Sequence, residues 1–373
     1  MENKGIKWPV YLKLSNIILG ILALFFILYI GKDIIIPIIF SIIIAILLNP
    51  FVNFLCRKRM NRVVAIMIAV VAAIVFIIAL AYFIFSQAVM LSDSLPHLKE
   101  KFSAFSNQCI SWVTNHFNIN KYKINTWLTK TRSEGMENST AVIGSALSYL
   151  TGILVLLFLI PVYIFMILFY KPLLLEFISK LFKSEKQEIV TEVLGQTKIL
   201  IQSYLVGLLI EAAIVATLNS VGLLILGIKY AVLIGVIGAL LNMIPYIGGL
   251  VAISIPMFIA LATKTPLDAF WVLILYLFVQ LVDNNFIVPK IVASKVKINA
   301  LISIIVVLIG GALWGVAGMF LAIPITAIIK VICDRIDVLN AFGFLIGDNQ
   351  PEIAKAFFKP KILEKLKSEV LEK

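Results

Sequence analysis

The chain has 373 residues, of which 61% are hydrophobic and 14% are charged, whereas soluble domains have about 45–50% apolar and ~25% charged residues. A soluble protein of this length would need many more charged side chains at its water-facing surface. The composition therefore excludes a single soluble domain and predicts an all-α, polytopic helical membrane protein. Helices are favoured over a membrane β-barrel because the apolar runs are continuous and do not alternate with polar residues.

The net charge is +12, from 32 Lys and Arg against 20 Asp and Glu. These positive charges lie in short segments beside apolar runs, where we expect them to contact membrane lipids. No basic stripe with interleaved aromatic residues is present to stack bases, so no nucleic-acid partner is expected. The three cysteines are odd in number and far apart, and they predict neither a disulfide framework nor a metal site: Cys56, Cys109 and Cys333.

About eight hydrophobic segments follow one another along the chain, at 12–30, 34–55, 63–85, 143–169, 201–226, 230–262, 267–289 and 299–332. A helix needs ~20 apolar residues to cross a bilayer, and most of these runs supply that length. The first run is expected to stay as a span, because no small-residue cleavage site follows it. The basic cluster from Arg57 to Arg62 predicts a cytoplasmic loop, which also places the N-terminus in the cytoplasm.

Five parts are expected from this pattern. They are an N-terminal unit of three spans (1–85), an external amphipathic segment (86–142), a fourth span with a cytoplasmic connector (143–200), a transport core (201–335) and a cytoplasmic amphipathic tail (336–373). The only two histidines, His97 and His116, lie in the external segment, and we expect both to be solvated surface residues.

Two of the apolar runs are too long for one crossing. Residues 230–262 would form about 50 Å of helix, but Pro245, Gly248 and Gly249 interrupt them. A single crossing would also put the basic residues 290–297 outside the cell, against the charge rule for cytoplasmic loops. Residues 299–332 are similarly interrupted by glycines. We therefore expect two inverted re-entrant hairpins, a pattern typical of transporter sites.

Glu211 lies near the centre of the run 201–226, where a carboxylate costs roughly 2.5–3.5 kcal/mol on insertion. It shares a helix face with Tyr204, Gly207 and Asn219. Two interpretations remain open at this point. Glu211 is either a proton or cation site, or a neutral, hydrogen-bonded contact in a seam between helices.

A second polar face combines Gln280, Asp283 and Asn284 on the run 267–289. Asp283 is either a cation ligand or a solvated residue paired with Lys290 or Lys295. Asn242 stands just before the Pro245 break and is expected to support exposed carbonyl groups there. The glycines of the last run suit close helix packing as well as they suit a pore.

The most specific motifs lie between residues 196 and 335. They are residues 202–207 (QSYLVG), 226–231 (LGIKYA), 242–249 (NMIPYIGG), 283–290 (DNNFIVPK) and 310–318 (GGALWGVAG), followed by Ile323-Pro324. In this order they resemble the autoinducer-2 exporter family, also called PerM-type permeases, of prokaryotic membrane proteins. The chain departs from the usual family pattern at 206–208, at Asp283, where the family often has Glu, and at 299–300. The resemblance implies export of small polar signals and, in some members, exchange of Na⁺ or Li⁺ for protons.

Our first hypothesis is a secondary transporter in a prokaryotic cell membrane, exporting a small polar solute or exchanging a monovalent cation for protons. The alternative is a non-transporting membrane scaffold or regulatory protein. A homo-oligomer with both termini in the cytoplasm is expected. No enzyme motif, cofactor or metal site is expected. The residues predicted to form the pathway are Tyr204, Gly207, Glu211, Asn219, Asn242, Pro245, Tyr246, Gly248, Gly249, Gln280, Asp283, Asn284, Pro289, Gly311, Gly315, Gly318 and Pro324.

Overall fold

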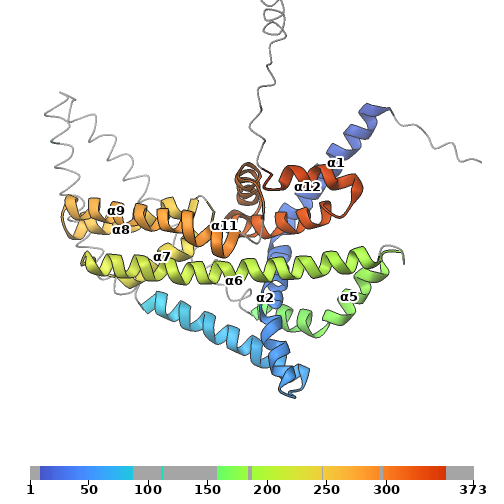
Figure 1. The fold of residues 1–373 in the computed structure, drawn as a ribbon, viewed down its shortest axis with the longest axis horizontal. Coiled ribbons are helices and arrows are strands. Elements are labelled where there is room, and N and C mark those ends of the chain that lie inside the picture. The colour runs from blue at the N-terminus through green and yellow to red at the C-terminus, as the bar shows by residue number, and fades with distance from the viewer. Residues whose placement is uncertain are drawn as a thin grey trace, which may run out of the picture.

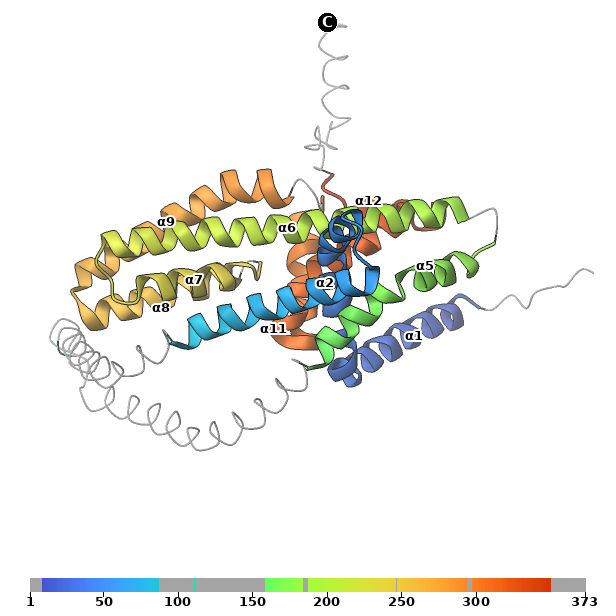
Figure 2. The same ribbon diagram turned by 90° about the horizontal axis from the view of Figure 1, so that it is seen from below.

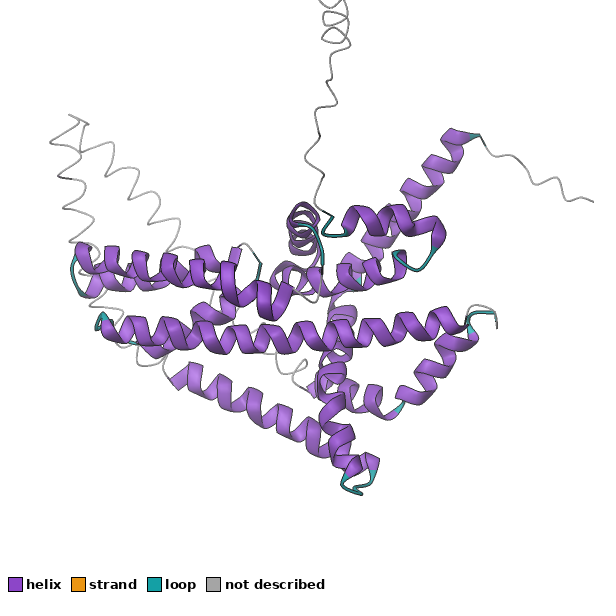
Figure 3. Cartoon of the chain, viewed as in Figure 1, coloured by secondary structure: helices purple, strands orange, loops and turns teal. Residues whose placement is uncertain are grey.

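A computed structural model describes residues 9–86, 111, 158–183, 187–245, 247–293 and 297–349. Within these ranges the regular elements are helices (Figure 3). They are α1 (Val10–Ile30), α2 (Lys32–Arg57), two unlabelled helices (Arg62–Ser86 and Phe158–Phe169), α5 (Lys171–Lys180), α6 (Gln187–Ile225), α7 (Ala231–Asn242), α8 (Ile247–Thr263), α9 (Pro266–Val282), the π-helix η2 (Asp283–Ala293), α11 (Ala300–Cys333), the 3₁₀ turn η3 (Asp337–Leu339) and α12 (Asn340–Ile346).

The prediction of an all-α polytopic membrane protein is confirmed. Five described helices are long and apolar enough to cross a membrane, and a sixth is obtained if Phe158–Phe169 and α5, which meet at 65°, form one broken span. The expected count of about eight segments is not established, because α7 and α8 and the apolar part of α1 are shorter than a full span. The external segment 86–142 and most of the tail lie outside the described residues, apart from single positions and 336–349.

Helix α6 is the element against which most of the others pack (Figures 1 and 2). Its 39 residues correspond to about 58 Å of helix. The boundary expected at residue 200 falls inside α6, because neither a proline nor a turn sequence separates the polar connector from the apolar span. Helices α7, α8 and α9 lie beside its C-terminal part, whereas α5 and α12 lie toward its N-terminal part (Figure 1).

The first long apolar run folds back on itself. After α6, the residues Gly227 and Tyr230 adopt left-handed backbone angles and turn the chain into α7. The chain breaks after Asn242 and returns as α8. At the far end of α8, Lys264 Nζ donates a hydrogen bond to the Leu226 carbonyl oxygen at 2.5 Å. Both ends of residues 230–262 therefore meet beside the C-terminus of α6, as a hairpin requires.

The second long run also contains a reversal. Within α11, Trp314 and Gly315 leave helical geometry, and Gly315 has a φ of 60°, an angle that glycine adopts without strain. Beyond this point the chain runs back, so that Gly310 and Gly318 face each other with their backbones in contact. A side chain at either position would overlap the other backbone, and for this reason only glycine allows so close an approach.

The two hairpins begin at opposite ends of α6. The base of the first lies at the C-terminus of α6, where Lys264 contacts Leu226. The base of the second lies near the N-terminus of α6, where Arg335 forms an ion pair with Glu192 at 2.6 Å. This geometry agrees with the expected inverted arrangement. How the two hairpins sit in a bilayer remains a prediction.

Contacts at the tips join the hairpins to the rest of the bundle. Trp314 Nε1, at the tip of the second hairpin, donates to the Leu28 carbonyl of α1 at 2.9 Å. Met243, at the tip of the first, packs in the same apolar cluster as Tyr204 and Ile323. Each tip therefore contacts another part of the bundle, while Gly315 and Val316 of the second tip are exposed.

A labelling experiment tests the inverted hairpins. In a chain without Cys56, Cys109 and Cys333, single cysteines replacing Lys229 and Lys264 are expected to react with a membrane-impermeant maleimide from the same side. Single cysteines replacing Lys290 and Lys330 are expected to react from the other side, because the hairpin bases lie at opposite ends of α6. Labelling of positions 229 and 264 from opposite sides would show that residues 230–262 cross the membrane once.

A substitution at Gly248 tests the packing of the first tip. A Cβ atom there would overlap the Leu241 carbonyl oxygen, so Gly248→Ala is expected to lower the free energy of unfolding by about 1–3 kcal/mol. Gly195→Ala is the matched control, because Gly195 lies in helix α6 with no atom within 4 Å of the added Cβ. It is expected to stabilise the protein by roughly 0.5–1 kcal/mol. Equal unfolding midpoints for the two variants in detergent would contradict this account.

Candidate functional site

Two buried carboxylates and one amide meet at the tip of the first hairpin. Asn242, the last residue of α7, directs Nδ2 to Asp283 Oδ2 at 2.7 Å and to Glu211 Oε1 at 3.5 Å. Glu211 and Asp283 are 5% and 1% exposed. Because an amide NH₂ group has two hydrogens, Asn242 can donate to both carboxylates at once. We refer to these three residues as the carboxylate cluster.

Local backbone features bring the three side chains together. The break after α7 leaves Asn242 at a helix end, where its side chain can reach two neighbouring helices. At Asp283 the α9 helix widens into η2, a π-helix that contains Pro289. Short π-helical turns are rare and occur often at functional sites. Glu211 is in the middle of the uninterrupted α6, which fixes its position along the bundle.

A cavity of about 770 Å³ adjoins the carboxylate cluster. Helix α6 supplies Glu211 to its wall, and both hairpins contribute, the first through Pro245 and Gly249 and the second through Ser303 and Ile323. From the cluster the cavity extends to residues at the base of the second hairpin. These are Lys297, Ile298, Ala300 and Asp348.

On the other side of the cluster the bundle is closed by apolar packing. Leu223 of α6, Ile234 of α7, Ala260 of α8 and Val272 of α9 belong to one buried hydrophobic cluster between the carboxylates and the base of the first hairpin. The cavity therefore reaches the carboxylate cluster from the side of the second hairpin's base.

Three polar atoms next to the carboxylate cluster have no hydrogen-bond partner among the described residues. They are Asn219 Oδ1, the Tyr276 hydroxyl and Asp283 Oδ1. All three residues line a small void of about 10 Å³ beside Gly238, close to the smallest volume that holds one water molecule. Buried polar atoms are normally satisfied. This void is therefore a position where a water molecule or a small cation would complete the hydrogen bonding or coordination.

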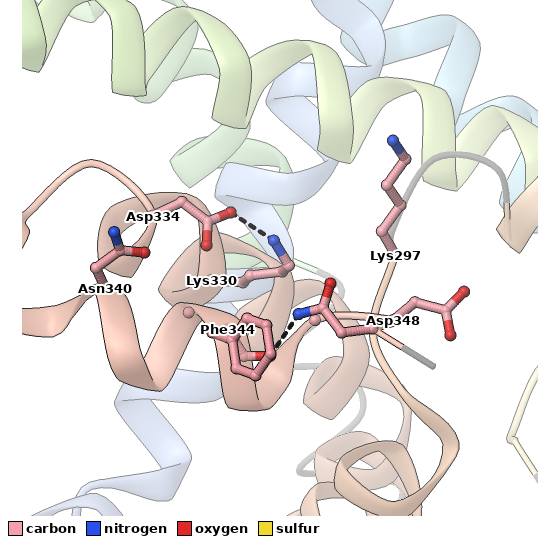
Figure 4. Close-up of a pocket in the computed structure, with 9 residues that line it drawn as sticks. Lys297, Lys330, Asp334, Asn340, Phe344 and Asp348 are labelled. Carbon is pink, nitrogen blue, oxygen red and sulfur yellow. Dashed lines mark hydrogen bonds and ion pairs between the residues drawn. The ribbon is translucent and has the colours of Figure 1, made fainter. Parts of the chain in front are cut away.

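A second cavity, of about 480 Å³, lies at the base of the second hairpin (Figure 4). Lys330 pairs with Asp334 on its wall, and Asn349 donates to the Phe344 carbonyl oxygen at 2.8 Å. Lys297 and Asp348 line both cavities, so the two spaces adjoin each other there. Their backbones are joined by a hydrogen bond of 3.2 Å from Asp348 N to Lys297 O.

The structure brings about half of the sequence-predicted pathway residues to the central cavity. Those that line it are Tyr204, Glu211, Asn242, Pro245, Gly249, Gln280, Asp283 and Asn284, and Asn219 lines the adjoining void. Tyr246 lies outside the described residues. The others do not line either space and lie in helix contacts, at the second tip or on the surface of η2: Gly207, Gly248, Pro289, Gly311, Gly315, Gly318 and Pro324.

Sequence reasoning missed four polar residues of the cavity. Tyr276 precedes Gln280 by four positions and Asp283 by seven, so the helical repeat would have placed it on the same face. Ser303, Lys297 and Asp348 carry no such signal, because they reach the cavity only through long-range packing at the second hairpin. In the part of the chain that the structure describes, no group of three or more His, Cys, Asp or Glu residues is arranged to hold a metal ion.

Comparisons with known proteins agree with the architecture. Residues 18–337 match the family model described as AI-2E family transporter. YueF of Bacillus subtilis, which bears the name of a transport protein, is 25% identical over 307 residues, covering 79% of this chain and 82% of YueF. YhhT of Escherichia coli K12, named in the same way, is 22% identical over 346 residues, covering 92% and 95%. PerM of the same strain, named as a permease, is 26% identical over 205 residues, covering 54% and 58%.

The multi-pass helical fold, with a central cavity that both hairpins help to line, and these relatives define the class of protein. It is a membrane transporter. More particularly, the chain belongs to the AI-2E transporter family.

A double-mutant cycle tests the carboxylate cluster. Asn242→Ala and Asp283→Ala remove the two ends of the 2.7 Å hydrogen bond, so their effects on unfolding free energy are expected to differ from additivity by about 0.5–3 kcal/mol. The control cycle pairs Asn242→Ala with Thr191→Ala, on the exposed N-terminal part of α6. That pair is expected to be additive within ~0.3–0.5 kcal/mol. Additivity in both cycles would show that the bond contributes nothing to stability.

Proposed function

We propose that this protein is a secondary transporter and not an enzyme, and that its coupling site is the carboxylate cluster of Glu211, Asn242 and Asp283. Through the central cavity it carries a small polar solute or exchanges a monovalent cation for protons. The observation that carries the proposal is the sharing of one buried amide by two buried carboxylates on the wall of the central cavity.

Charge balance is the first support. When both carboxylates are ionised, they place two negative charges on one neutral amide in an apolar bundle, and such charges are costly unless they are compensated. The described residues that line the cluster's end of the cavity contribute amides and hydroxyls, whereas the cation Lys297 lies at the other end. A bound proton or a monovalent cation would supply the missing positive charge. A site that needs one such ion is suited to exchange one ion for another.

The small void supports a position for the ion. Asn219 Oδ1, Asp283 Oδ1 and the Tyr276 hydroxyl are oxygen atoms, and oxygen ligands suit hard cations. In this proposal the cation sits between these oxygens and Glu211 carries a proton in the alternate step. The proton and the cation then compete for the same negative charge, so binding of one favours release of the other.

The two hairpins support alternating access. The cavity reaches the cluster from the base of the second hairpin, while apolar packing closes the route to the base of the first. In the proposed orientation, with both termini in the cytoplasm of a prokaryotic cell, this arrangement is open to the inside. Movement of the first hairpin against α6 would open the other side, since transporters of this type work by rocking one unit against another.

Transport assays on reconstituted protein test the proposal. Glu211→Gln is expected to remove the pH dependence of exchange, and Asp283→Asn is expected to weaken the dependence on Na⁺ or Li⁺, because each removes one negative charge from the cluster. Proteoliposomes with an internal pH-sensitive dye would be exposed to Na⁺, Li⁺ and proton gradients in turn, and flux of labelled polar solutes would be measured in parallel.

Glu188→Gln is the matched control for this assay. Glu188 lies on the same helix as Glu211 but is exposed in its first turn, so its loss is expected to leave transport unchanged. If both cluster variants behaved as the parent protein at every pH and cation concentration, the carboxylates would be structural contacts only.

A further inference from the structure

A second polar cluster lies away from the central cavity, where α2, the helix Arg62–Ser86, α5 and α6 come together. Asn49 of α2 is 6% exposed, and its Oδ1 accepts a hydrogen bond of 2.9 Å from Lys171 Nζ at the start of α5. Arg62 Nη2 donates to the Leu168 carbonyl oxygen at 3.0 Å, one position before the end of the helix Phe158–Phe169. Lys198 of α6 acts electrostatically on Lys171, as does Arg62. We refer to Asn49, Arg62, Lys171 and Lys198 as the cationic corner.

Donors outnumber acceptors in the cationic corner. Asn49 Nδ2 is buried and has no hydrogen-bond partner among the described residues. Asn49 Oδ1 accepts the hydrogen bond from Lys171. Lys171 has three N–H donors, of which one is used by Asn49. None of the three cations of the corner belongs to an ion pair within the described part of the chain. The remaining donors of Lys171, beside two further unpaired cations, favour an anionic acceptor.

The surroundings of the corner suit an amphipathic ligand. Phe169 and Tyr170, directly before Lys171, are exposed aromatic residues. Phe54 of α2 is also exposed, with Lys58 Nζ 4.8 Å from its ring centroid. Exposed aromatic rings beside basic residues are typical of the interface between the hydrocarbon core and the headgroups of a bilayer.

We infer that the cationic corner is a binding site for a phosphate group, which Lys171 contacts directly while Asn49 holds Lys171 in place and Arg62 and Lys198 contribute positive charge. The phosphate belongs to a phospholipid headgroup or to a phosphate ion in solution. Phosphate oxygens accept short, charge-assisted hydrogen bonds from Lys and Arg and also bonds from neutral amides. The corner is separate from the carboxylate cluster, so this inference holds whatever solute the protein carries.

Ligand-dependent unfolding of the full-length protein tests the site. In neutral detergent, the unfolding midpoint would be followed against added phosphatidylglycerol, phosphatidylcholine or inorganic phosphate, since a ligand of the folded state raises the midpoint. A rise with phosphatidylglycerol alone identifies a lipid headgroup as the source, whereas a rise with inorganic phosphate in the absence of lipid identifies the free ion. No rise beyond that seen with phosphatidylcholine would overturn the inference.

Variants then locate the site. Lys171→Met and Asn49→Asp are each expected to weaken the apparent affinity at least about tenfold, a factor that corresponds to about 1.4 kcal/mol. Asn49→Asp is the sharper variant, because its carboxylate can pair with Lys171 and keep the protein folded while repelling phosphate. Lys198→Met provides a second charge-removing variant if Lys171→Met fails to fold, and it is expected to weaken binding in the same direction.

Lys180→Met is the matched control. Lys180 is on the same helix as Lys171, but its side chain is 73% exposed and paired with Glu176. It is expected to bind phosphatidylglycerol or phosphate as the parent protein does. Parental affinity in both Lys171→Met and Asn49→Asp, or an equal loss in Lys180→Met, would show that the anion does not bind at the cationic corner.

Discussion

The structure depends on a single constraint, which is that two carboxylates buried in an apolar helical bundle need hydrogen-bond donors. Asn242 donates to one oxygen of Glu211 and one of Asp283 at once. The backbone of the core is arranged so that this is possible. α6 runs without a break to carry Glu211 into the bundle, α7 ends where Asn242 is required, and the last turns of the α9 span widen into η2 at Asp283. The irregular backbone therefore coincides with the polar side chains, as expected where a membrane protein lines a cavity.

Close backbone contact makes these irregular segments stable. Association of helices in a membrane gains little from the hydrophobic effect, so it relies on packing and on small residues that let backbones approach. Gly310 and Gly318 provide this contact within the second hairpin, and Gly248 provides it at the tip of the first. These glycines do not line the cavity. Their importance for the cavity is indirect, because they hold the two hairpins in the positions from which other residues line it.

Polar chemistry in this protein is divided between two places. The carboxylate cluster is rich in acceptors and lacks positive charge, whereas the cationic corner is rich in donors. Helix α6 contributes to both, with Glu211 in the carboxylate cluster and Lys198 in the cationic corner. In the proposed orientation the cationic corner lies near the cytoplasmic face of the membrane, where anionic headgroups are found. The carboxylate cluster lies within the bundle, on the wall of the central cavity.

The amino-acid sequence by itself determined the class of fold and the breaks in the two longest apolar runs, but not the continuous α6 or the π-helix at Asp283. These features depend largely on local properties: apolar runs specify helices, and two of the runs are interrupted at Pro245 and Gly315. Proline alone does not decide a break, because Pro256 and Pro324 stay inside helices. The helical repeat also placed Tyr204, Glu211 and Asn219 on one face, and Gln280 and Asp283 on another. Only the tertiary structure decided that the two faces meet at Asn242.

Tertiary structure alone also brought Lys297, Asp348 and Ser303 to the cavity and Asn49 to Lys171. These residues are far apart in the sequence, and no periodicity links them. Their neighbours are set by how the hairpins pack against α6 and how α5 packs against α2. Packing of that kind depends on the shapes of many side chains together, which a pattern read along one chain does not contain.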